Sequence, residues 1–148
     1  MLKVKFNIAK QFIKPFIQIN AAQKSTELQQ LAESIQKLTQ EWLITGYQNR
    51  QQFVLSLPQI VRFYTENGAV ICETDNQHHY RIKERIYFLH NQLPKEMFLQ
   101  ISSAEIVNIN KIDYFSLSKA GRYQINLTNG TLTYVSRRFV KTIKEDLS

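Results

Sequence analysis

The chain of 148 residues lacks several features that would define its function by themselves. Cys72 is the only cysteine, so no disulfide can form within the chain, which fits a reducing compartment. Four glycines are too few for a glycine-rich phosphate loop. No apolar run approaches the roughly 18 residues of a membrane-spanning helix, and the lysine-interrupted start lacks the apolar core of a signal peptide. We therefore expect a cytoplasmic protein.

The sequence also lacks the residue patterns of common enzymes. His78 and His79 are adjacent, and with Cys72 they do not form a recognised zinc spacing, so we expect a polar loop and no metal site. Three acidic residues of one predicted hairpin are expected to face solvent: Glu66, Glu73 and Asp75. The sequence therefore predicts neither an enzyme nor a cofactor, and it predicts no small-molecule substrate.

Positive charge is in excess, and it is concentrated at the two ends of the chain. The formal net charge is +7, and 43% of the residues are hydrophobic, as in a folded globular protein. Residues 1–23 hold four lysines and no acidic residue, and residues 119–148 hold six basic and two acidic residues. Such charge favours a polyanionic partner, either a nucleic acid or an anionic membrane surface.

The first 46 residues predict a β-β-α segment. Residues 2–8 alternate apolar and polar side chains, and residues 16–20 resemble a second strand. Residues 26–45 have the apolar spacing of an amphipathic helix, with Thr26 and Gln29 at capping-box positions and Gly46 as the expected stop. This helix either packs on its own hairpin or forms the seam of a homodimer, and the two possibilities are compatible.

Residues 47–148 predict a second, mainly β domain with two short helices. Asn67-Gly68 and Asn129-Gly130 are hairpin-turn pairs, and the first is typical of a type I′ turn. One expected helix covers residues 82–93, before Pro94. A final helix is expected after Ser136 as its cap, with Phe139, Val140, Ile143 and Leu147 on its apolar side. The expected strands are 52–57, 60–65, 69–74, 98–102, 105–109, 112–118, 123–127 and 132–135.

The start of the last predicted helix is a candidate anion site. Arg137 and Arg138 follow Ser136, a good N-cap residue, and Lys141 lies one turn further on. A helix start offers free backbone N–H groups to an anion, and guanidinium groups bind phosphate or guanine through paired hydrogen bonds. The alternative is that both arginines are solvated or pair with Glu145 or Asp146.

Two stretches resemble the signatures of the LytTR family of DNA-binding domains. The first is Leu93-Pro94-Lys95-Glu96-Met97-Phe98 with Ile106-Val107-Asn108-Ile109-Asn110-Lys111-Ile112. The second is Gly121-Arg122-Tyr123, Asn129-Gly130-Thr131 and Val135-Ser136-Arg137-Arg138-Phe139-Val140-Lys141. The resemblance covers about residues 47–148. It implies an elongated fold of about ten short strands in three small sheets, whose loops enter successive major grooves of double-stranded DNA.

The resemblance also implies which residues contact DNA. Three regions would do so: the turn at Glu66, Asn67 and Gly68, the pair Ser102 and Ser103, and the helix start with Arg137, Arg138 and Lys141. Arg138 corresponds to a base-reading position, whereas Arg137 and Lys141 are better placed for phosphate. Lys83, Lys119 and Arg122 would hold the DNA backbone. Ser103 replaces a residue that is usually basic or Asn in the family, so base reading there is expected to be weak.

The chain resembles the short, stand-alone type of this family, which has no receiver domain. That resemblance implies a transcription regulator that binds direct repeats as a homodimer, and whose partner is often a membrane-bound inhibitory protein. The alternative from another functional class is a protein-interaction module that binds a partner through the 26–45 helix.

Overall fold

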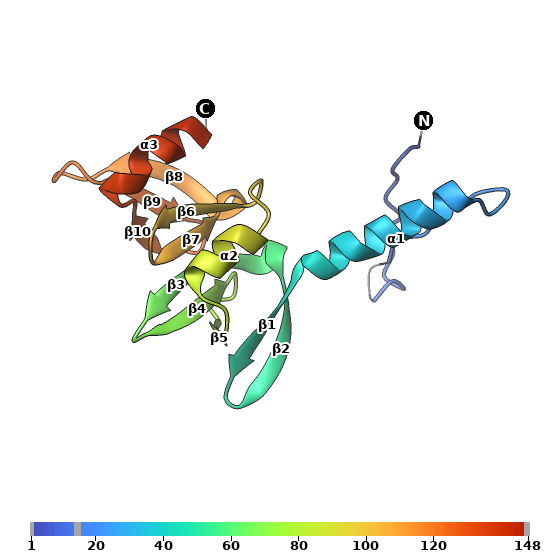
Figure 1. Ribbon diagram of the computed structural model, residues 1–148, viewed down its shortest axis with the longest axis horizontal. Helices are drawn as coiled ribbons and strands as arrows, with labels where there is room; N and C mark the ends of the chain where they lie inside the picture. The colour runs from blue at the N-terminus through green and yellow to red at the C-terminus, as the bar shows by residue number, and fades with distance from the viewer. Residues whose placement is uncertain (1, 14–15, 147–148) are drawn as a thin grey trace. The chain divides into compact units, whose positions relative to one another are not determined.

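A computed structural model describes residues 2–13 and 16–146 of the chain (Figure 1). The described residues form ten strands, three α-helices and two short 3-10 helices. The chain divides between residues 39 and 40 into two compact units, called unit 1 (residues 1–39) and unit 2 (residues 40–148) below. The division lies before the predicted boundary at residue 46.

Unit 1 contains most of helix α1 (Thr26–Glu41). The helix begins where it was predicted, but its cap is Ser25, whose hydroxyl accepts a hydrogen bond from the Leu28 N–H at 3.2 Å. The helix ends at Glu41, so the predicted end at residue 45 is wrong. The predicted strands at 2–8 and 16–20 are also wrong, because neither segment forms a strand. An isolated pair of strands is marginal in water without further packing.

Ten strands build unit 2, and eight of them match predicted strands to within one residue at each end. They are β1 (Leu43–Gln48), β2 (Gln51–Ser56), β3 (Ile60–Glu66), β4 (Ala69–Thr74), β5 (His79–Ile82), β6 (Phe98–Ser102), β7 (Glu105–Asn108), β8 (Ile112–Leu117), β9 (Tyr123–Leu127) and β10 (Leu132–Tyr134). The helical elements of unit 2 are η1 (Leu57–Gln59), α2 (Ile86–Gln92), η2 (Ile109–Lys111) and α3 (Arg137–Asp146). The mainly β class with two short helices in this part of the chain is confirmed.

The strands form two antiparallel sheets rather than the expected three. One has seven strands in the order β2-β1-β5-β4-β3-β7-β6, and the other has three in the order β10-β9-β8. The difference arises from β1 and β5, which the sequence analysis did not predict. Strand β5 pairs with β4 and, through Arg81 opposite Tyr47, with β1. It thereby joins the β1–β2 hairpin to the rest of the large sheet.

Gly46 lies inside β1 and does not end a helix. A Cβ atom at this position would lie 2.7 Å from Tyr80 Cβ and 2.8 Å from Leu55 Cδ1. The glycine is therefore required by the close approach of neighbouring side chains in the sheet.

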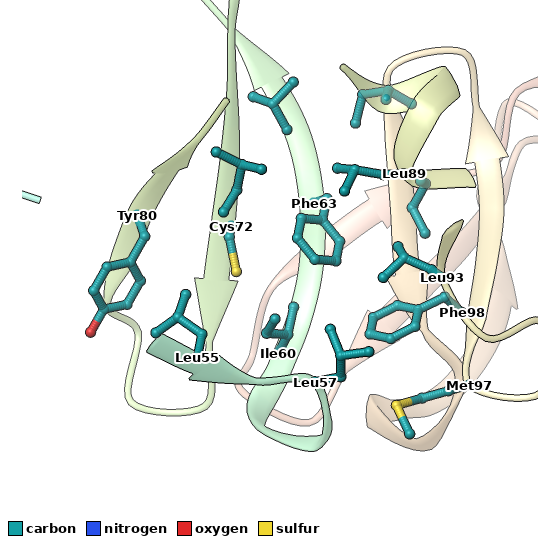
Figure 2. Close-up of a cluster of buried hydrophobic side chains, with 14 residues drawn as sticks. Leu55, Leu57, Ile60, Phe63, Cys72, Tyr80, Leu89, Leu93, Met97 and Phe98 are labelled. Atoms are coloured by element: carbon teal, nitrogen blue, oxygen red, sulfur yellow. The ribbon is translucent and has the colours of Figure 1, made fainter. Parts of the chain in front are cut away.

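One hydrophobic core lies between the large sheet and α2 (Figure 2). Ile86 and Leu89 lie on one face of α2, and Leu93 follows at its end. They pack in the same cluster as Phe63 of β3, which is fully buried and whose ring centroid is 5.7 Å from that of Phe98. The predicted helix at 82–93 was too long at its start, because Ile82 ends β5.

A second core lies on the opposite face of the large sheet. Side chains alternate along a strand, so Val107 of β7 faces away from Ile106 and the first core. Val107 packs in one cluster with Ile125 of the small sheet and Ile143 of α3. The small sheet and α3 are therefore held to the large sheet by a continuous apolar contact, which fixes the position of α3.

A group of charged residues, called the carboxylate cluster below, lies beside this second core. It consists of Arg62, Glu73 and Glu105. The Nε atom of Arg62 donates to Glu73, and its Nη1 atom donates to Glu105 Oε1 at 2.7 Å. Glu73 is only 4% exposed, so the expectation that it faces solvent is wrong. Glu66 and Asp75 are exposed as expected.

The β9–β10 hairpin of the small sheet supplies the remaining partners of the carboxylate cluster. Thr131 Oγ1 and Asn129 Nδ2 donate to Glu73 Oε1 at 3.0 and 3.2 Å. Thr133 Oγ1 donates to Glu105 Oε2 at 2.5 Å. Asn129 lies in the turn of this hairpin, Thr131 follows the turn, and Thr133 lies in β10. The cluster thereby connects the two sheets through hydrogen bonds to ionised groups.

Replacement of Arg62 by Ala should destabilise the protein strongly. Removing one partner of a buried ion pair leaves the other charge without compensation, at a cost of about 3–5 kcal/mol in the free energy of unfolding. Urea unfolding followed by circular dichroism measures this change. Arg81→Ala, which removes an exposed guanidinium from β5, is the control and should cost less than about 0.5 kcal/mol. A loss of similar size in both variants would contradict the assigned role of Arg62.

Glu73 should make stability depend on pH in the acid range. Burial by itself raises the pKa of Glu73, but the hydrogen bond and charge of Arg62, with smaller contributions from Thr131 and His79, lower it overall. A carboxyl whose pKa is lower in the folded state stabilises the fold above its unfolded pKa of about 4.3, and this stabilisation is lost as the pH falls through the folded value.

The test is the free energy of unfolding measured from neutral pH down to the acid range. Glu73→Gln should be less stable than the native chain at neutral pH, and the difference should shrink as the pH falls below about 4.3. Glu96→Gln makes the same chemical change at an exposed position and is the control. A difference between Glu73→Gln and the native chain that stays constant with pH would refute the assignment.

Candidate nucleic-acid interface

Backbone hydrogen bonds connect the three regions that were predicted to contact DNA. The Thr65 N–H, at the end of β3, donates to the Ala104 carbonyl in the β6–β7 turn at 3.0 Å. The Ser136 N–H, just before α3, donates to the Ile101 carbonyl in β6 at 2.9 Å. The β3–β4 turn, the β6–β7 turn and the start of α3 are therefore neighbours in space, although they are far apart in the sequence.

The turn between β3 and β4 has the geometry that its sequence predicts. Asn67 and Gly68 have φ angles of 52° and 77°, as a type I′ turn requires at both central positions. Glu66 pairs with Ala69 across the hairpin. Glu66, Asn67 and Gly68 are all exposed, so the turn can approach a partner without rearrangement.

The β6–β7 turn holds the two predicted serines in different environments. Ser102 is half-buried, and its hydroxyl accepts a hydrogen bond from the Ala104 N–H at 3.2 Å, which shapes the turn. Ser103 is exposed. Of the two side chains, that of Ser103 is the more accessible to a ligand.

Helix α3 begins at Arg137, directly after Ser136, as predicted. Arg137, Arg138 and Lys141 are all exposed. Ile143 is buried in the second core, so the helix is anchored by its apolar side while the three cations face outward. The Arg138 guanidinium carbon lies 5.4 Å from the centre of the Phe139 ring, within cation–π range. This contact restricts the guanidinium group beside the helix start.

A groove with an excess of positive charge joins the first two of these regions. It encloses about 760 Å³, and its lining includes Gly68 and Ser103 from the two turns. Lys83 also lines it, close to the Tyr47 ring, with 4.6 Å between the ammonium nitrogen and the ring centre. The charged residues of the lining are Arg81, Lys83, Glu84 and Arg85. This groove, with all the residues that line it, is called the basic groove below.

Arg81 and Arg85 are additions that the sequence analysis missed. The pattern that could have revealed them is the alternation along β5, where Tyr80 and Ile82 are buried and His79 and Arg81 are exposed. The helical spacing of residues 82–93 conceals this short strand, which places Arg81 two residues before the predicted contact Lys83. Arg85 is the N-cap residue of α2 and is exposed.

Lys119 and Arg122 lie elsewhere, at the β8–β9 turn of the small sheet, and neither lines the basic groove. The turn is closed by the Ser118 hydroxyl, which accepts from the Arg122 N–H at 3.0 Å. The Arg122 guanidinium carbon lies 4.6 Å from the centre of the Tyr134 ring in β10, two residues before Ser136. Both residues thus form a separate basic region.

Neither a metal-binding cluster nor a membrane-spanning helix is found among the described residues. No group of three or more His, Cys, Asp or Glu side chains in residues 2–13 and 16–146 could hold a metal ion. Burial, with a smaller effect from Glu73, raises the pKa of the Cys72 thiol, which lies in the first core. In the same part of the chain, no helix is both long enough and apolar enough to cross a membrane.

Unit 2 is thus a β-rich domain that presents basic side chains from turns and from one helix start, an arrangement suited to a polyanionic ligand. The family model described as the LytTr DNA-binding domain matches residues 50–148. The chain therefore belongs to the LytTR family of DNA-binding proteins, and DNA binding rather than catalysis is the activity of that family.

Relatives over the full length of the chain agree with this assignment, and one solved structure shares the fold. An uncharacterized HTH-type transcriptional regulator of Staphylococcus aureus strain MRSA252 is 31% identical over 148 residues, which is all of this chain and 99% of that protein. A regulator of the same description in strain MSSA476 is 30% identical over the same shares. The solved LytTr DNA-binding domain of a methyl-accepting/DNA response regulator from Bacillus cereus superposes with a TM-score of 0.68 at 15% identity. That match covers 72% of this chain and 96% of the other, and it shows the shared fold.

The label "HTH-type" describes those relatives and does not match the geometry of unit 2. A helix-turn-helix needs two helices joined by a short turn. Among the residues that the structure describes, five strands separate α1 from α2, and five more separate α2 from α3.

Proposed function

We propose that the protein is a transcription regulator that binds double-stranded DNA sequence-specifically through unit 2. The observation that carries the proposal is the adjacency of the two turns and the α3 start, with the basic groove between the turns. Turns that project from a rigid sheet can reach base edges in a major groove, where each base pair presents a distinct pattern of donors and acceptors. The relatives named as transcriptional regulators support the regulatory role.

In this proposal the contact residues divide into two classes. Arg138 reads a base, because a guanidinium group can donate two hydrogen bonds to guanine, and Glu66 can accept one from cytosine. Arg137, Lys141 and Lys83 bind phosphate, which positions the protein without reading sequence. The other contact residues have smaller roles. The approach to the bases is shaped or lined by Asn67, Gly68, Ser102 and Ser103. Arg81 and Arg85 extend the phosphate contacts, and Lys119 and Arg122 hold a more distant phosphate.

We further propose that two copies occupy direct repeats, with successive turns entering successive major grooves. In a bacterium, a regulator that binds chromosomal DNA acts in the cytoplasm. We also propose a membrane-bound inhibitory partner, on the basis of the resemblance to the short stand-alone type. The protein-interaction alternative is favoured by one observation, the apolar face of α1, but this face is compatible with DNA binding by unit 2.

The central test is replacement of Arg138 by Ala, measured on a duplex that the native protein selects from a random-sequence pool. Loss of a bidentate base contact should weaken this binding by about 1–3 kcal/mol and relax the preference at one base pair. Lys141→Ala should weaken binding to all duplexes alike. It should also reduce the slope of log affinity against log salt concentration by about one. Gel-shift titrations at several salt concentrations distinguish the two effects.

The control for both variants is Lys95→Ala. Lys95 is exposed and precedes β6, so it lies at the opposite end of that strand from the β6–β7 turn. It removes one positive charge and should leave affinity nearly unchanged. Unaltered binding by Arg138→Ala, or an equal loss in Lys95→Ala, would refute the proposed interface.

Ser103 offers a test in the opposite direction. Ser103→Arg should place a cation in the basic groove and tighten DNA binding about two- to fivefold, with a steeper salt dependence. Gln92→Arg adds the same charge at the end of α2, away from the groove, and is the control. If both variants tighten binding equally, net charge rather than the groove is responsible.

A further inference from the structure

We propose that residues 2–20, called the N-terminal segment below, bind the surface of an anionic lipid bilayer. The structure describes this segment at residues 2–13 and 16–20, where it forms neither a helix nor a strand. It belongs to unit 1, whereas the DNA binding proposed above is assigned to unit 2. The inference therefore adds a second class of ligand, and it does not depend on the proposed function.

Large apolar side chains are exposed along the described part of the N-terminal segment. Val4 is 88% exposed, Phe6 87% and Ile8 86%. None of the side chains at residues 2–13 and 16–20 is buried. Exposed apolar side chains in such number mark a surface that contacts another molecule. The other large apolar side chains exposed there are those of Leu2, Ile13, Phe16, Ile17 and Ile19.

Positive charge is interleaved with these apolar side chains. Lys3, Lys5 and Lys10 are exposed, and Lys14 is the fourth lysine of the N-terminal segment. The segment contains no acidic residue, and the first one in the chain is Glu27. The ligand must therefore offer negative charge and apolar cover within the same small area.

A turn in the N-terminal segment brings two aromatic rings together. The Phe12 N–H donates to the Ala9 carbonyl at 3.1 Å. The Phe12 ring lies edge-on to the Phe16 ring, with 5.5 Å between the ring centroids. Paired rings form a compact apolar unit, and Phe is among the residues with which membrane-surface segments enter the bilayer.

A DNA duplex matches only one of the two requirements. Its phosphates bind lysine, but interfaces with DNA are polar and strongly basic. The described part of the N-terminal segment exposes more large apolar side chains than the whole segment has lysines. A duplex would therefore pair with the lysines and leave the apolar side chains in water.

A second copy of the N-terminal segment matches only the other requirement. It would cover apolar side chains, but it would bring two sets of four lysines together without one acidic residue between them. Like charges that face one another directly oppose such pairing. Self-association through this segment is therefore disfavoured by its charge.

An anionic bilayer satisfies both requirements at once. Its headgroups attract lysine, and the acyl-chain boundary beneath them accepts apolar side chains. Stable attachment to a membrane surface takes two such contributions acting together. A regulator attached in this way lies on the surface where the membrane-bound inhibitory partner proposed above would meet it, and only this consequence rests on the proposed function.

The experiment measures cosedimentation of the full chain with phosphatidylglycerol vesicles and with phosphatidylcholine vesicles. The native chain should bind the anionic vesicles at least about tenfold more tightly, because each lysine near an anionic surface strengthens binding about fivefold. Lys3→Gln/Lys5→Gln should weaken binding to the anionic vesicles about 25-fold for the same reason. The control is Lys37→Gln/Lys95→Gln, which removes the same charge at two exposed positions outside the segment and should bind as the native chain does.

A second pair of variants separates the N-terminal segment from the basic surface of unit 2, which also attracts anionic lipid. Phe6→Thr/Ile8→Thr keeps every charge and should weaken binding to phosphatidylglycerol vesicles about tenfold or more, because two apolar side chains no longer enter the bilayer. Val54→Thr/Leu117→Thr is its control, since Val54 and Leu117 are exposed in strands of unit 2. Urea unfolding of unit 2 should be the same in the native chain, Lys3→Gln/Lys5→Gln and Phe6→Thr/Ile8→Thr.

Gel-shift titration on a duplex selected by the native chain keeps the two proposals distinguishable. Both variants of the N-terminal segment should retain the native affinity for this duplex. A chain that binds anionic vesicles and selects no duplex contradicts the proposed function and leaves the membrane contact standing. A chain that selects a duplex and binds no vesicles does the reverse.

Four results would overturn the inference. The first is equal binding of the native chain to the two kinds of vesicle, and the second is native-like vesicle binding by either variant of the N-terminal segment. The third is a loss of duplex affinity in Lys3→Gln/Lys5→Gln as large as its loss of vesicle affinity, which would assign the lysines to DNA. The fourth is a native dimer that Phe6→Thr/Ile8→Thr converts to a monomer in sedimentation equilibrium, which would assign the apolar side chains to a second copy.

Discussion

The ion pairs of Arg62 with Glu73 and Glu105 are the interaction on which the arrangement of unit 2 depends. Burying two carboxylates against one guanidinium group leaves excess negative charge, which must be satisfied by hydrogen-bond donors. The β9–β10 hairpin supplies them through Thr131 and Thr133. A purely apolar contact would let one sheet slide over the other, whereas these directional hydrogen bonds fix one relative position of the two sheets. The apolar second core then packs around a geometry that polar groups have fixed.

That relative position determines where the candidate DNA contacts lie. Helix α3 rests on the second core through Ile143, and its start is held to β6 by the Ser136 N–H. The β6–β7 turn is held to β3 through Thr65. The two turns and the helix start therefore move with the sheets rather than independently. Because these contact residues are already held in place, binding would order few of them further. The entropy cost of binding would therefore be small.

Much of unit 2 was predictable, because its strands alternate cleanly and its turns contain Asn-Gly pairs. The exceptions have physical causes. The apolar spacing of α1 continues to Trp42 and Gly46 resembles a helix stop, so the first three residues of β1 were assigned to the helix. Strand β5 has only four residues. The buried state of Glu73 was not predictable, because two of its hydrogen-bond donors, Asn129 and Thr131, come from a hairpin more than fifty residues away. The strands expected in unit 1 were inferred from alternation alone, and alternation does not supply a neighbouring strand.

The exposure of the reading residues has an evolutionary consequence. Ser103, Glu66 and Arg138 occupy turn or helix-start positions whose side chains contribute to neither core. Under the proposed function, each can be exchanged without disturbing the packing that holds the domain together. A duplicated gene for such a protein could therefore acquire a new operator through a few substitutions at these positions. Divergence of paralogous regulators on this scaffold would be limited by selection for distinct target sites, and much less by the stability of the fold.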